Sequence, residues 1–86
     1  MSWDILIMDS DTHPVYDKEG NVSNPDKPVV IGEHVWVGCR SMILKGSTIP
    51  KNCIVAAGTI VSGQTFEENT VIAGQPPKSV KEIGTW

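Results

Sequence analysis

Aliphatic residues recur at a strict spacing of six through the middle of the chain. The residues of this column are Ile31, Val37, Ile43, Ile49, Val55 and Val61. A helix would repeat its apolar residues every three to four positions and a half-buried strand every two, so neither element explains the column. A period of six indicates a coil with flat sides, in which each side is a short strand and each corner a turn.

Two further columns share this period. Four positions after each aliphatic residue the side chain is small or β-branched: Val35, Ser41, Ser47, Cys53, Thr59 and Thr65. Three positions after each aliphatic residue stand His34, Arg40, Gly46, Asn52, Gly58 and Gln64. Because glycine and asparagine tolerate positive φ, the latter column predicts a turn that repeats every six residues.

Three such sides close into a triangular prism, so positions three repeats apart lie over one another in successive coils. The aliphatic column then points to the axis, and parallel strands stack about 4.8 Å apart. The expected stacks are Ile31 on Ile49, Val37 on Val55 and Ile43 on Val61. A β-sandwich would show period-two alternation with turns every eight to twelve residues, which this segment lacks. We therefore predict an all-β parallel solenoid.

Composition limits the function. The chain has 86 residues and a formal net charge of -3, which argues against a nucleic-acid partner held by bulk positive potential. Two cysteines allow at most one disulfide, so free thiols in a reducing cytosol are expected. The start of the chain is neither a basic signal peptide nor a membrane span. We expect one cytoplasmic domain with no membrane partner.

The chain is expected to form a single domain, residues 1–86, in four parts. These are a lead-in strand at 5–8, a long loop at 9–28, β-helix coils at 29–66 and a tail at 67–86. The coils are expected to end at Phe66, because Glu67 falls in the axial column. In the tail, Pro77 suits the start of a helix, and Val80 and Ile83 fall three apart, which predicts a short helix over 77–83.

Three segments resemble one known family, in that family's order. They are DSDTHPV in the loop, VVIGEHVWVGCRSMILKGSTIPKNCIVAAGTIV in the coils and VIAGQPPKSV in the tail. Together they are similar to the C-terminal half of the hexapeptide-repeat acyltransferases, particularly the maltose, galactoside and polysaccharide O-acetyltransferases. The resemblance covers about residues 5–83. It implies a left-handed parallel β-helix, against the usual right-handed crossover rule, and a homotrimer.

The resemblance also implies acetyl transfer from acetyl-coenzyme A to a hydroxyl of a sugar or polysaccharide. Such a reaction needs a base near pH 7 and a hydrogen-bond donor for the oxyanion. His13 stands where the family keeps its base, and imidazole suits that role. Asp9 and Asp11 are candidates to orient the ring or raise its basicity, and turn formation is an equal alternative for both.

The family pattern assigns further catalytic roles beside the first coil. The backbone amide of Cys39 corresponds to the donor to the thioester carbonyl, and Gly38 would let a ligand approach the backbone. Trp36 precedes an axial residue and should face outward, where it packs under a loop or walls the site; the family pattern implies the second. Cys53 falls in the small column and is expected in the core.

The coenzyme-binding residues follow from the same resemblance. Ala57 and Gly58 correspond to the stretch that meets the pantetheine arm, although a tight corner would also require small residues there. Ser62 stands where the family has a basic or hydroxyl residue near the phosphates. Lys78 and Lys81 are left to meet the nucleotide, and the alternative is that they are only solvated.

No metal site is expected. The possible ligands are His13, His34, Cys39 and Cys53, and none of their spacings matches a close ligand pair of the CxxC type.

A second functional hypothesis remains beside the enzyme. Family members have further coils before the histidine loop, so the chain could instead be a truncated, catalytically incomplete module that serves assembly or binds coenzyme A.

Overall fold

The computed structural model describes residues 4–86, and every regular element in that range is a strand. The strands are β1 (Leu6–Ile7), β2 (Val30–Ile31), β3 (Trp36–Val37), β4 (Met42–Leu44), β5 (Thr48–Ile49), β6 (Ile54–Val55), β7 (Ile60–Ser62), β8 (Thr70–Ala73) and β9 (Lys78–Glu82). Among these residues there is no helix that could cross a membrane.

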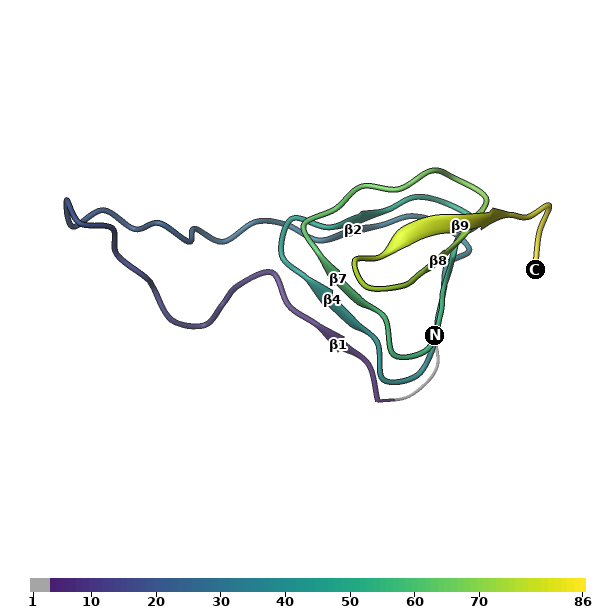
Figure 1. The fold of residues 1–86 in the computed structure, drawn as a ribbon, viewed down its shortest axis with the longest axis horizontal. Coiled ribbons are helices and arrows are strands. Elements are labelled where there is room, and N and C mark those ends of the chain that lie inside the picture. Colours follow the sequence, from purple (N-terminus) through teal and green to yellow (C-terminus); the bar gives the residue numbers. More distant parts are fainter. Residues whose placement is uncertain (1–3) are drawn as a thin grey trace.

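The strands form three sheets that make the sides of a prism. Their orders are β1-β4-β7, β2-β5 and β3-β6-β8-β9, and every pair is parallel except β8 with β9. In Figure 1 the coils superimpose into a triangular outline. The predicted stacks are confirmed in register: Ile31 with Ile49, Val37 with Val55 and Ile43 with Val61.

The core and the corners follow the predicted columns. The aliphatic column from Val37 to Val61 is fully buried, and Ile31 is partly buried against it. In the small column, Ser41, Ser47, Cys53 and Thr59 are buried. The turn column has positive φ at His34, Arg40, Gly46, Asn52 and Gly58. Short strands thus alternate with corners at which one residue has positive φ, as the period of six predicts.

The predicted end of the coils at Phe66 is wrong. At the next corner the positive φ falls one residue earlier than the period predicts, at Gly63 instead of Gln64. Val55 consequently pairs with Ile72, which is fully buried, and a third coil continues through β8. A corner that loses one residue still allows the strands to pair, because only the strand register has to be kept.

The predicted helix over 77–83 is also wrong, since this segment forms β9. It pairs antiparallel with β8, from Ala73 opposite Lys78 to Thr70 opposite Glu82. So short a helix would leave most of its backbone groups without intrahelical partners, whereas the open edge of β8 supplies partners for a strand. Val80 is 59% exposed in β9, so the spacing of Val80 and Ile83 does not mark a buried apolar face.

A long insertion interrupts the first coil. Ile43 and Ile49 are consecutive members of the axial column, and their partners in the preceding coil are Ile7 and Ile31. The chain between these two partners is far longer than one repeat, and we call its residues 8–29 the arm. The arm contains an isolated antiparallel bridge between Tyr16 and Val22 and projects away from the prism (Figure 1). It replaces the corner between β1 and β2 and carries His13.

Candidate functional site

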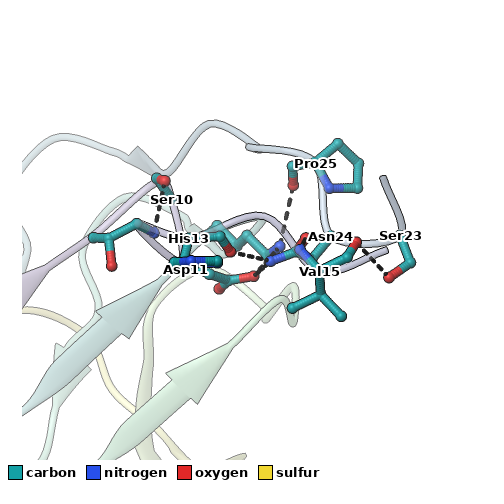
Figure 2. A network of polar contacts seen from close by, with 9 residues as sticks. Ser10, Asp11, His13, Val15, Ser23, Asn24 and Pro25 are labelled. Atoms are coloured by element: carbon teal, nitrogen blue, oxygen red, sulfur yellow. Dashed lines mark hydrogen bonds and ion pairs between the residues drawn. The ribbon is translucent and has the colours of Figure 1, made fainter. Parts of the chain in front are cut away.

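Asn24 holds the two sides of the arm together (Figure 2). Its amide nitrogen donates hydrogen bonds to Oδ2 of Asp11 and to the carbonyl oxygen of His13, both at 2.9 Å. Its side-chain oxygen accepts a hydrogen bond from the backbone N–H of Val15. The outgoing and returning sides of the arm are therefore fixed around His13 by one side chain.

Lys45 joins this arrangement to the prism. Its ammonium lies 2.6 Å from Oδ2 of Asp11 and 3.1 Å from the carbonyl oxygen of Pro25. The Lys45 side chain is only 20% exposed. The hydrogen bond from Lys45, followed by that from Asn24, holds the pKa of the Asp11 carboxyl below its ordinary value. Asp11 is thus an ionised anchor between arm and prism.

Protonation of Asp11 should loosen the base of the arm. Because its pKa in the folded chain lies below the ordinary 3.8, the contact with Lys45 stabilises the fold above that pH. This contribution is lost as the pH falls through the lowered value. We expect the Asp11 carboxyl carbon to titrate below pH 3.8 in NMR spectra, and Lys45→Met to raise the midpoint toward 3.8. Lys18→Met, at the exposed tip of the arm, is the control; an equal shift in both variants would contradict the assignment.

The imidazole of His13 is exposed, and its Nδ1 lies 2.8 Å from the carbonyl oxygen of Pro14. A carbonyl only accepts, so the neutral ring carries its proton on Nδ1 and leaves the lone pair of Nε2 free. The hydrogen bonds of Asp11 go to Lys45 and Asn24 rather than to this ring. The Pro14 carbonyl therefore orients the imidazole.

His13 borders a cavity of about 360 Å³. The cavity is lined by Ser10, Asp11, Thr12, His13, Pro14, Val22, Asn24, Pro25 and Asp26. All of these residues belong to the arm, so the structure does not bring the other predicted site residues into this cavity.

Four residues to which the sequence analysis assigned roles meet at another corner of the prism: Gly38, Cys39, Ala57 and Gly58. The N–H of Gly58 donates to the carbonyl oxygen of Cys39 at 3.0 Å, and Gly38 packs directly against Ala57. A Cβ on Gly58 would meet no atom within 4 Å, so this corner is open on its outer side. The structure thus brings together the backbones of Cys39, Ala57 and Gly58.

The remaining coenzyme candidates are divided. Lys78 pairs with Ala73, at the end of β8. The neighbouring Ile72 carbonyl accepts a hydrogen bond from the N–H of Ala56, directly before Ala57, so Lys78 lies near the corner just described. Lys81 lies further along β9, and both lysines are exposed. Ser62 lies in β7, within a different sheet. The predicted phosphate-binding residues therefore do not form one cluster.

An aromatic cluster lies beside Trp36, which is 44% exposed as its outward column predicts. The Trp86 ring lies 5.9 Å from the Trp36 ring and stacks on His34 at 3.8 Å. The indole N–H of Trp86 also donates to the His34 carbonyl oxygen. Sequence reasoning missed Trp86, for which the one available signal was a large aromatic residue within a polar tail. Among residues 4–86, no three potential metal ligands of the His, Cys, Asp or Glu type gather.

Comparisons with known proteins agree with this architecture. Residues 28–63 match the bacterial transferase hexapeptide (six repeats) family. The solved structure of the polysialic acid O-acetyltransferase OatWY superimposes with a TM-score of 0.92 and 42% identity, covering 100% of this chain and 41% of that one.

Curated relatives include the galactoside O-acetyltransferase of Escherichia coli K12, 36% identical over 83% of this chain and 35% of the relative. The 2,3,4,5-tetrahydropyridine-2,6-dicarboxylate N-acetyltransferase of Staphylococcus aureus RF122 is 44% identical over 64% of this chain and 23% of the relative. The chain thus spans about a third or less of these relatives. Its parallel three-sided coils fit a left-handed β-helix, and its residues 28–63 carry the hexapeptide repeat of the bacterial transferases.

Proposed function

We propose that the chain is the base-carrying part of an acetyl-CoA-dependent O-acetyltransferase that acts on a sugar or polysaccharide hydroxyl. The observation that carries this proposal is the geometry of His13. Its ring borders an open cavity, and the Pro14 carbonyl holds Nδ1 so that Nε2 is free to accept a proton. The relatives named as O-acetyltransferases of galactosides and polysialic acid support the same reaction and acceptor class.

In the proposed reaction, Nε2 of His13 takes the proton from the acceptor hydroxyl as its oxygen attacks the thioester carbonyl. The new C–O bond forms, the C–S bond breaks, and the imidazolium returns its proton to the leaving thiolate. The Cys39 amide donates to the oxyanion. His13 and Cys39 lie on different parts of the chain, so the reaction requires the arm of one copy to meet the Cys39 corner, of the same copy or of another.

The corner formed by Cys39, Ala57 and Gly58 suits the pantetheine arm, because its outer side is open and its backbone accessible. Lys78 and Lys81 on β9 are the proposed contacts of the coenzyme phosphates. Ser62 lies in a different sheet, so its hydroxyl would have to come from another copy. Trp36 would wall the acyl chain. These roles agree with the exposure of the side chains and with the family pattern.

The direct test is to incubate the chain with acetyl-CoA and a panel of sugars and to follow thiol release. Amino acceptors belong in the panel, since one relative is an N-acetyltransferase. We expect release above the rate without acceptor for at least one hydroxyl acceptor. Coenzyme A binding without thiol release for any acceptor would favour the incomplete module instead. Thiol release with amines alone would show that the acceptor is an amine and not a hydroxyl.

We also propose that the chain assembles as a homotrimer, which is supported by an apolar row on the sheet β1-β4-β7. Leu6, Met42 and Ile60 pair in register across three strands and are 43%, 40% and 39% exposed. Three aligned aliphatic side chains favour burial against another subunit.

Met42→Glu should therefore shift the chain toward the monomer, because the row would have to bury a charge. Lys51→Ala changes the net charge by the same amount at an exposed position and should leave the assembly unchanged. Mass in solution is the measurement. A monomeric parent chain, or identical masses for both variants and the parent, would refute this interface.

A further inference from the structure

The arm is attached at a corner that lies beside Lys45 of the following coil. β1 leads into the arm, whereas the paired β4 leads directly into Lys45 and Gly46. The Gly46 N–H donates to the carbonyl oxygen of Pro28 at 3.1 Å, so the base of the arm lies against this corner. From this corner, Lys45 of the prism reaches both sides of the arm.

Lys45 contacts both sides of the arm. Its ammonium reaches Asp11 on the outgoing side of the arm and the Pro25 carbonyl on the returning side. Asp11 and the His13 carbonyl then share the amide of Asn24. A continuous chain of hydrogen bonds connects the prism to the backbone of His13, as Figure 2 shows for the arm residues.

We infer that Lys45, Asp11 and Asn24 are positioning residues for the proposed acetyl transfer, and that they fix the backbone of His13 relative to the prism. This inference rests on the proposed function. None of the three side chains bonds to the imidazole ring, whose Nδ1 partner is the Pro14 carbonyl. They therefore set where the base lies, while the Pro14 carbonyl orients its ring.

This division has a kinetic consequence. Misplacing a base by about 1 Å can lower the rate on the order of 100-fold, while the affinity for a substrate held elsewhere is kept. Loss of the chain of hydrogen bonds should accordingly lower kcat and leave KM for acetyl-CoA within about twofold. A residue that bound the coenzyme would instead raise that KM.

The test compares Lys45→Met, Asp11→Asn and Lys45→Arg with Lys18→Met. Lys18 lies exposed at the tip of the arm, so its variant loses the same charge outside the network. We expect roughly a 10- to 100-fold lower kcat for Lys45→Met and Asp11→Asn, substantial recovery with Lys45→Arg, and no change for Lys18→Met. Amide hydrogen exchange of Val15 and Ser23, whose N–H groups bond across the arm, should accelerate in the first two variants.

The outcomes separate this inference from the proposed function. A parent chain without turnover overturns the proposed function, and the positioning role falls with it. If the parent turns over and Lys45→Met matches Lys18→Met in kcat, the positioning role alone is wrong. A lower kcat with a KM for acetyl-CoA raised well beyond twofold, or with unchanged exchange of the arm, likewise overturns it. Asp11→Asn, which keeps the side-chain shape, guards against a folding defect at Lys45, and the melting temperature of each variant is measured alongside.

Discussion

Replacing His13 by alanine should lower kcat/KM for acetyl transfer by about 10²- to 10⁴-fold, the usual contribution of a positioned general base. The structure gives this residue a defined tautomer, since the Pro14 carbonyl accepts from Nδ1 and leaves Nε2 free. It also borders the cavity of the arm, where an acceptor hydroxyl can approach. The measurement is thiol release at saturating acetyl-CoA with the best acceptor from the panel.

Two further variants make this result specific. His13→Gln retains an amide that can donate to Pro14 but has no basic nitrogen, so it should be as slow as His13→Ala. Tyr16→Ala removes an exposed ring from the same arm, outside the cavity lining, and should keep the parent rate. If His13→Gln turned over at the rate of Tyr16→Ala, the imidazole would not be the base.

The coils can be predicted from the sequence because every coil repeats the same requirements. The axis needs an aliphatic residue such as Val55, and the corners need residues that accept positive φ, such as Asn52 and Gly58. These requirements are local and periodic, so they are visible in the order of residues alone. The third coil escapes the pattern because the corner at Gly63 loses one residue, which moves the axial partner of Val55 from position 73 to Ile72.

The tail cannot be predicted in this way because its conformation depends on a partner. Val80 and Ile83 have helical spacing, yet the open edge of β8 decides the outcome by pairing with β9. Local propensity over so short a segment is weak beside a row of backbone hydrogen bonds.

The candidate site can be predicted only in part, for a related reason. The resemblance points to His13, but Asn24 and Lys45 carry no motif. Lys45 meets Asp11 across 34 residues, because the insertion of the arm brings the next corner beneath it. The Pro14 carbonyl that orients the ring is a backbone group, and no side-chain pattern reports it. Contacts created by an insertion become visible only when the coils are stacked.

Alanine at Gly38 should destabilise the fold by about 1–3 kcal/mol, the usual cost of overpacking. A Cβ there would lie 2.5 Å from the backbone nitrogen of Ala57, and real Cβ atoms essentially never come within 3.0 Å of another atom. Since the clash is with backbone, the two coils must separate, which strains the 2.8 Å hydrogen bond from Gly38 to the Val55 carbonyl. Gly84→Ala is the control, because its Cβ would meet nothing within 4 Å.

Urea unfolding of the two variants also decides why glycine stands at position 38. If Gly38 serves the approach of a ligand, as the family pattern implies, Gly38→Ala would weaken coenzyme A binding and leave the unfolding midpoint unchanged. The structure gives a packing reason, so we expect a lower midpoint with an unchanged m-value. Gly32→Ala should behave alike, because its Cβ would lie 2.7 Å from the backbone nitrogen of Lys51. If Gly38→Ala had the same midpoint as Gly84→Ala, the coils would tolerate a side chain at position 38. The glycine would then be explained by the approach of a ligand.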